Sequence, residues 1–128
     1  MKAEVGHEFE LVKKPTTRTL VQYAGASGDF YEIHYDQDYA RSIGLPGVIL
    51  HGLLQAGFLG QLVTDFAGNE ARLKTFEVSY RGMAQPARPF TCKGVVKAVD
   101  GKDVQLEIWG EDADGKKTVI GSATLERR

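Results

Sequence analysis

From His51 to Phe66 the pattern of the chain is helical and strongly apolar. No charged residue occurs from Gly52 to Thr64, and the apolar residues recur at the spacings of an α-helix. We therefore predict a helix that is buried on nearly all sides. Gly57 and Gly60 each destabilise a helix by about 1 kcal/mol relative to alanine, so we expect another backbone to approach the helix closely at these positions. The apolar residues are Leu53, Leu54, Ala56, Phe58, Leu59, Leu62, Val63 and Phe66.

The second half of the chain shows the alternating pattern of β-strands. From Phe76 to Arg81, apolar or aromatic residues alternate with polar ones, which indicates a half-buried strand. Further strands are predicted at about 91–99, 104–109 and 118–125. Because Asp100-Gly101 and Asp114-Gly115 are typical of hairpin turns, we expect an antiparallel meander here.

Shorter elements precede the long helix. A strand at residues 9–12 ends before Pro15, and Thr16 and Thr17 are suitable caps for a helix at about 18–26. Asp36 can cap a second helix at 37–43, and residues 29–34 form the turn between the two helices. One early strand, one long helix and a late meander predict a single α+β domain over residues 1–128.

Composition narrows the class of protein. The formal net charge of −1 over 128 residues gives no reason to expect nucleic acid or an anionic membrane as partner. Cys92 is the only cysteine, so an internal disulfide is excluded and a reducing compartment is expected. The apolar run at 47–63 is shorter than the roughly 20 residues of a membrane span, and the N-terminus lacks a signal-peptide pattern. We therefore expect a cytoplasmic protein.

The turn between the two short helices carries the candidate chemistry. Asp29 and His34 lie five positions apart, and a carboxylate and an imidazole that share one water can move protons near neutral pH. Each residue alone is more often structural, since aspartate is common in turns and histidine in hydrogen-bonding roles. The long helix begins soon afterwards at His51-Gly52, and its N-terminus would favour negative charge beside the pair.

The run Tyr23–Asp29 (Tyr-Ala-Gly-Ala-Ser-Gly-Asp), followed by Ile33-His34 and by His51-Gly52, resembles the MaoC-like dehydratases, the (R)-specific enoyl-CoA hydratases of the hot-dog fold. The resemblance implies an antiparallel sheet wrapped around a long central helix. It also implies a homodimer in which two sheets join, with the acyl chain in a tunnel at the interface.

The same resemblance implies hydration of a trans-2-enoyl thioester to the (3R)-hydroxyacyl thioester, or the reverse dehydration. Asp29 and His34 would be the acid–base pair, and the backbone N–H of Gly52 would stabilise the enolate oxygen. The expected substrate is an acyl-CoA or acyl-carrier thioester, and no metal or redox cofactor is expected.

Four further residues are predicted to contact the substrate: Phe30, Tyr31, His51 and Leu53. The usual family motif is Asp-x-Asn-Pro-(aliphatic)-His, whereas this chain has Tyr31-Glu32 in place of Asn-Pro. The turn therefore lacks the groups that normally stiffen it. Phe30 and Tyr31 suggest a bulky wall that favours short or unusual acyl chains. Glu32 either raises the pKa of His34 or points into solvent.

Two other functions stay open on the sequence. One is a non-catalytic acyl-CoA-binding hot-dog protein, or a subunit of a two-component dehydratase. The other is a thioesterase, whose carboxylate in this fold usually comes from the central helix. Here that helix has no acidic residue from Gly52 to Thr64, and Asp65 lies near its far end, which argues against a thioesterase.

Overall fold

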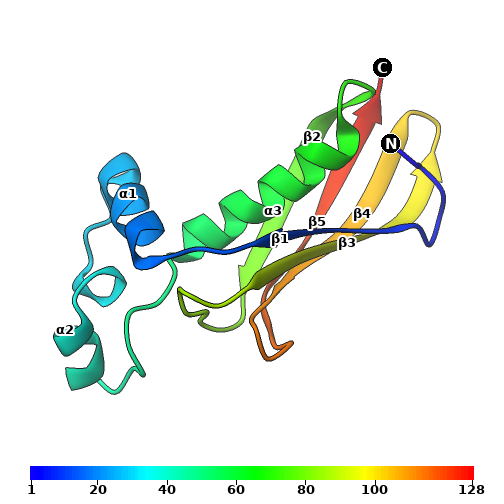
Figure 1. Cartoon of the computed structure of the whole chain (residues 1–128). Coiled ribbons are helices and arrows are strands. Elements are labelled where there is room, and N and C mark those ends of the chain that lie inside the picture. Colours follow the sequence, from blue (N-terminus) through cyan, green and yellow to red (C-terminus); the bar gives the residue numbers. More distant parts are fainter.

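The computed structural model describes residues 1–128 as a five-stranded antiparallel sheet with one long helix across it (Figure 1). The strand order is β1-β3-β4-β5-β2, so β1 and β2 form the two edges. The strands are β1 (Glu8–Lys13), β2 (Ala71–Tyr80), β3 (Phe90–Asp100), β4 (Asp103–Glu111) and β5 (Lys117–Arg127). The helices are α1 (Thr17–Ser27), the 3-10 helix η1 (Glu32–His34), α2 (Gln37–Ser42) and α3 (Gly52–Ala67).

The predicted meander is formed by β3, β4 and β5. Its two turns contain Gly101 and Gly115, with φ angles of 59° and 81°, which glycine adopts without the steric cost of a side chain.

The sequence pattern missed the first five residues of β2. This part of the edge strand is exposed from Arg72 to Thr75 and has no buried face to produce alternation. Backbone pairing with β5 extends the strand.

Thr16 and Asp36 cap the two short helices as predicted, whereas Thr17 is the first residue of α1. The Thr16 hydroxyl accepts a hydrogen bond from the Thr19 N–H at 3.3 Å, and the Thr19 hydroxyl accepts one from the Thr16 N–H at 3.0 Å. The Asp36 carboxylate accepts one from the Tyr39 N–H at 3.0 Å. These bonds satisfy N–H groups that a helix leaves without partners in its first turn. The turn that contains Asp29 lies between α1 and α2 in the chain.

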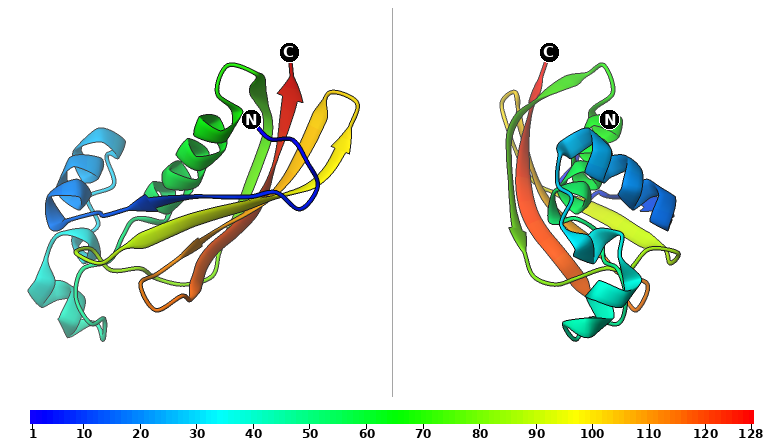
Figure 2. Two further views of the ribbon diagram at one scale, coloured as in Figure 1. Left: turned by 45° about the vertical axis from the view of Figure 1, so that its right-hand side comes forward. Right: turned by 90° about the vertical axis from the view of Figure 1, so that its left-hand side faces the viewer.

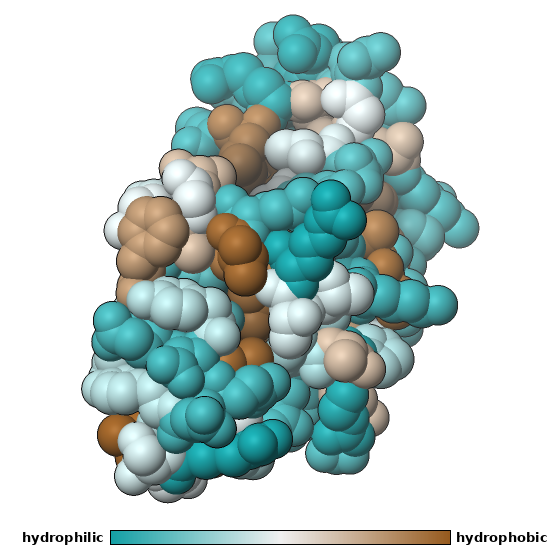
Figure 3. All heavy atoms as spheres, turned by 60° about the vertical axis from the view of Figure 1, so that its left-hand side comes forward, coloured by the Kyte–Doolittle hydropathy of each residue, from teal (hydrophilic) through white to brown (hydrophobic).

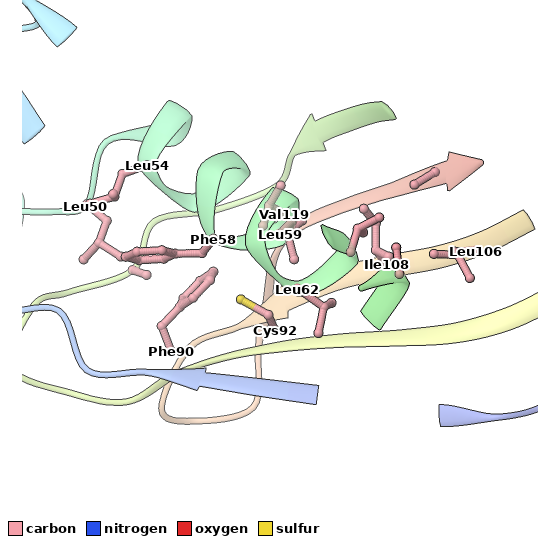
Figure 4. Packing of buried hydrophobic residues seen from close by; sticks show 14 of the residues in the cluster. Leu50, Leu54, Phe58, Leu59, Leu62, Phe90, Cys92, Leu106, Ile108 and Val119 are labelled. Carbon is pink, nitrogen blue, oxygen red and sulfur yellow. The ribbon is translucent and has the colours of Figure 1, made fainter. Parts of the chain in front are cut away.

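The hydrophobic core lies between α3 and the concave side of the sheet (Figure 2). Phe58, Leu59 and Leu62 point from α3 toward the sheet, where they meet Phe90 of β3 and Ile108 of β4 (Figure 4). None of the helices combines the length and the apolar character that a membrane crossing requires.

The expectation that α3 is buried on nearly all sides is wrong. Leu53 is 62% exposed, and Gly57, Gln61 and Thr64 are exposed as well. The predicted close approach at Gly57 and Gly60 is also wrong within this chain, because a Cβ atom at either position would meet nothing within 4 Å. One sheet covers only one side of a helix, so the opposite side of α3 faces outward.

Cys92 is buried in the core, and burial raises the pKa of its thiol to about 12. Because the thiolate is the reactive form, we expect Cys92 not to react with a disulfide reagent such as DTNB in the folded protein at about pH 8. It should react stoichiometrically after denaturation in urea. Rapid labelling of the native protein would show that the core opens readily around β3.

Candidate active site

The turn after α1 places Asp29 beside His34. The Ser27 hydroxyl accepts a hydrogen bond from the Asp29 N–H at 3.1 Å, and Asp29 Oδ1 accepts one from the Tyr31 N–H at 3.3 Å. These local bonds hold the turn without the Asn-Pro pair of the usual motif. Because Oδ1 is used in the turn, the second carboxylate oxygen, Oδ2, is the one that faces His34.

The tautomer of His34 follows from its surroundings. His34 Nδ1 lies 2.8 Å from the backbone carbonyl oxygen of Ile49, and since a carbonyl only accepts, Nδ1 carries the proton. The other nitrogen, Nε2, therefore has a free lone pair, and it lies 3.7 Å from Asp29 Oδ2. That separation is too long for a direct hydrogen bond, but it allows one water at about 2.8 Å from both atoms.

His51 lies against the face of His34. The two rings are stacked with centroids 3.7 Å apart and an interplanar angle of 17°. His51 is 0% exposed, and its Nε2 donates to the backbone carbonyl of Asp29 at 3.3 Å. His51 is the N-cap residue of α3, yet its side chain makes no capping hydrogen bond. The side chain instead contacts the ring of His34 and the backbone of Asp29.

We expect His51 to make the folded protein less stable in mild acid. Burial, and next the neighbouring His34, lower the pKa of His51 from its ordinary 6.5. As the pH falls through about 6.5, the unfolded chain takes up a proton that the folded chain resists, so the free energy of unfolding decreases toward lower pH. Urea denaturation from about pH 7.5 to pH 5 measures this. The loss should be smaller in His51→Phe, and an equal loss in both proteins would contradict the prediction.

Gly52 is the first residue of α3 and lies at the site. N–H groups in the first turn have no acceptor inside the helix, and the helix dipole adds positive potential there. A Cβ atom at Gly52 would lie 3.2 Å from Cε1 of Tyr80. The glycine thus allows the ring of Tyr80, the last residue of β2, to pack against the start of α3.

Two tyrosines near the site were not among the predicted site residues. Tyr23 lies edge-on to His51 at a centroid distance of 4.8 Å. Burial, Tyr80 and Asp29 together raise the pKa of Tyr23, so the two tyrosines and the carboxylate share one environment. Tyr23 belongs to the sequence run that carries the family resemblance, which was the only available signal for it. Tyr80 had no such signal, because its position depends on how β2 approaches α3.

The predicted substrate-binding residues lie in different settings. Tyr31 packs edge-on to both His34 and Tyr39, at centroid distances of 6.3 and 6.1 Å. Phe30 and Leu53 are largely exposed, and apolar surface lies among polar side chains on the side where the short helices come forward (Figure 3). Their roles in binding stay predictions.

The carboxylate of Glu32 is exposed and accepts a hydrogen bond from the Tyr35 hydroxyl at 3.5 Å. Desolvation of the Tyr35 hydroxyl, and next the nearby Glu32 carboxylate, raise the pKa of Tyr35. Of the two alternatives for this residue, the structure favours a carboxylate at the surface.

Asp29, His34 and His51 hold potential ligand atoms within 4.8 Å of one another, yet their arrangement does not fit a metal ion. A metal bound by histidine lies close to the plane of the imidazole ring, about 2 Å from the nitrogen. Two rings stacked 3.7 Å apart and nearly parallel cannot both direct a lone pair at one ion. In addition, His51 Nε2 carries the proton that it donates to Asp29.

The relatives of this chain include a CoA hydratase subunit and several fatty acid synthase beta subunits. The chain is 28% identical over 119 residues to the 3-oxo-4,17-pregnadiene-20-carboxyl-CoA hydratase beta subunit of Mycobacterium tuberculosis, covering 93% of this chain and 88% of that protein. It is 29% identical over 113 residues to the fatty acid synthase beta subunit TOXC of Cochliobolus carbonum. That match spans 83% of this chain but only 5% of the much longer synthase subunit.

Solved structures show the same fold. The (R)-hydratase of A. caviae involved in PHA biosynthesis superimposes with a TM-score of 0.91 at 22% identity, covering 98% of this chain and 97% of that one. A chain of the ChsH1-ChsH2 complex of Mycobacterium tuberculosis gives a TM-score of 0.88 at 26% identity, with both chains fully covered. The predicted α+β hot-dog fold is therefore confirmed. Residues 2–119 match the model of the MaoC like domain, and the chain belongs to this family of hydratases and dehydratases.

Proposed function

We propose that this protein catalyses the (R)-specific hydration of a trans-2-enoyl thioester, enoyl-CoA to (3R)-hydroxyacyl-CoA, and the reverse dehydration. One observation carries the proposal: the free lone pair of His34 Nε2 and the carboxylate oxygen of Asp29 lie 3.7 Å apart, beside the N-terminus of α3. This arrangement can hold and deprotonate one water next to a group that stabilises negative charge.

In the proposed reaction, His34 Nε2 accepts a proton from the water that bridges it to Asp29. The water oxygen forms a bond to C3 while the C2–C3 π electrons move toward the thioester carbonyl, giving an enolate. The Gly52 N–H donates to the enolate oxygen. His34 then delivers this proton to C2, so H and OH have been added and His34 regains its initial protonation state. No redox change occurs, and the proposal needs neither a metal nor a redox cofactor.

The first test is the loss of crotonyl-CoA absorbance at the enoyl thioester band, followed by chiral analysis of the product. We expect (3R)-hydroxybutyryl-CoA to form, with a panel of longer and bulkier enoyl thioesters defining the preferred acyl group. Formation of the (3S) product, or turnover of no thioester in the panel, would contradict the proposal. Release of free thiol, followed in parallel, would instead indicate a thioesterase.

A thioesterase has little support in the structure. The only acidic residue of α3, Asp65, lies 13 residues after Gly52 in the helix. At 1.5 Å per residue, this places it about 20 Å along the axis from the helix N-terminus. A carboxylate so far from Asp29 and His34 has no access to the same carbonyl group.

The second candidate is the catalytic subunit of a hydratase made of two different chains. The mycobacterial relative that this chain matches nearly end to end is itself named a beta subunit, and the matching structure is a complex of two proteins. Because this chain has both Asp29 and His34, it would supply the acid–base pair in either assembly.

Our proposal is a homodimer, in which a second copy covers the outward side of α3. Light scattering should give the mass of two chains, and an inactive monomer would favour the two-chain assembly.

A further inference from the structure

We propose that His51 is a positioning residue, whose Nε2–H holds the Asp29 backbone while its ring supports the face of His34. This assignment rests on the proposed function and goes beyond the substrate contact predicted for His51. It explains how a carboxylate in an exposed turn and an imidazole at the protein interior keep one relative geometry.

The first argument is that His51 does not suit a purely structural role. Its Nδ1 is buried and has no hydrogen-bond partner, although buried polar atoms in proteins nearly always have one. An apolar side chain would fill the same space without leaving a nitrogen unsatisfied. Nor does the start of α3 require histidine, because the side chain caps no N–H group. A histidine here lowers the stability of the fold, and a functional role would account for its presence.

The second argument is the hydrogen bond to Asp29. The other hydrogen bonds of Asp29 are local, to Ser27 and Tyr31, and its side chain is 45% exposed. The bond from His51 Nε2 spans 22 positions of sequence and connects the turn to the start of α3. It therefore ties the backbone of the catalytic carboxylate to the helix whose N-terminus lies at the site.

The third argument is the packing of the two rings. The bond from Nδ1 to the Ile49 carbonyl holds the edge of His34, and His51 covers one face at 3.7 Å. Tyr23 packs edge-on against His51 and supports it from another side. The groups that face His51 are thus His34, Tyr23 and the Asp29 turn. A neutral His51 supports His34 without opposing the positive charge that His34 gains when it accepts a proton.

Two substitutions separate the contacts of His51. His51→Phe keeps an aromatic face under His34 but cannot donate to Asp29. His51→Gln places an amide N–H where Nε2–H was but removes the ring. We expect His51→Phe to lower kcat for the preferred enoyl thioester by about a hundredfold, the cost of a misplaced catalytic group, with KM changed less than about threefold. Because the Ile49 carbonyl still holds His34 when the ring is removed, we expect His51→Gln to stay within about tenfold of the wild-type kcat.

The matched control is Thr118→Val, which removes a fully buried hydrogen bond, 2.7 Å long, to Gln55 one turn further along α3. It should lower the melting temperature by roughly 3–5 °C and leave kcat unchanged. His51→Phe should show the opposite pattern, with kcat lost and the melting temperature kept. Wild-type kcat in His51→Phe, or equal loss of kcat in the Phe and Gln variants, would overturn the proposal.

Nuclear magnetic resonance provides a readout that does not depend on turnover. In His51→Phe, the backbone amide signals of Asp29 and Tyr31 and the imidazole signals of His34 should shift or broaden. In His51→Gln the amide signals should recover, and in Thr118→Val they should stay in place. If no thioester is turned over, these signals still test the positioning role, whereas the proposed function would have failed. Unchanged Asp29 and Tyr31 signals in folded His51→Phe would refute the positioning role even in an active enzyme.

Discussion

Replacing Asp29 by asparagine is expected to reduce kcat for hydration by at least about a hundredfold, the usual contribution of a general acid–base group. The substitution changes little else, because an asparagine oxygen can still accept the hydrogen bond that Asp29 Oδ1 takes from the Tyr31 N–H. The turn should keep its shape, while the negative charge that binds the water beside His34 is lost.

The measurement is the steady-state rate with the preferred enoyl thioester, together with a thermal melt. Asp38→Asn is the matched control, because it makes the same chemical change at an exposed position of α2. The control should keep wild-type kcat, and both variants should melt close to the wild type. An Asp29→Asn enzyme that retains a third or more of wild-type kcat would rule out the carboxylate as a catalytic group.

Replacing His34 by alanine is expected to cause a loss of kcat of similar size. The variant lacks the Nε2 lone pair that faces Asp29 at 3.7 Å, and it leaves a space between His51 and the Ile49 carbonyl. Added imidazole should therefore restore part of the activity. His34→Asn is a closer test of chemistry, because its amide N–H can still donate to the Ile49 carbonyl while no base occupies the Nε2 position.

His7→Ala is the control for loss of a histidine, since His7 packs against Phe66 at the other end of α3. It should leave kcat unchanged. In the double variant Asp29→Asn/His34→Ala, the loss should be about that of the worse single variant, because residues that act as a unit are strongly non-additive. Additive losses would indicate that the two residues act in separate steps.

The dominant elements of the fold were predictable because their signals are local. Thr16 and Asp36 cap helices through bonds to residues three positions later. Gly101 and Gly115 lie in tight turns of the meander. The exposed start of β2 was not predictable, since an edge strand without a buried face is defined by its pairing with β5.

The contacts of the candidate site are likewise of two kinds, local ones and ones that depend on the tertiary structure. Asp29 and His34 were predicted from sequence because one short turn holds both, so their proximity needs no distant contact. The stacking of His51 on His34 and the packing of Tyr80 against Gly52 were not predicted. These contacts join residues that only the folding of α3 onto the sheet brings together.

The sequence by itself determined the long apolar helix, the β-meander and the Asp29–His34 pair, since periodicity, capping and turn chemistry act over a few residues. Only the tertiary structure decided which side of α3 stays uncovered, with Leu53 and Gly57 facing outward. It also decided the tautomer of His34, through the Ile49 carbonyl, and the lowered pKa of His51, through burial and the neighbouring His34. These properties depend on which groups are removed from water together, and that is settled when the sheet closes over one side of the helix.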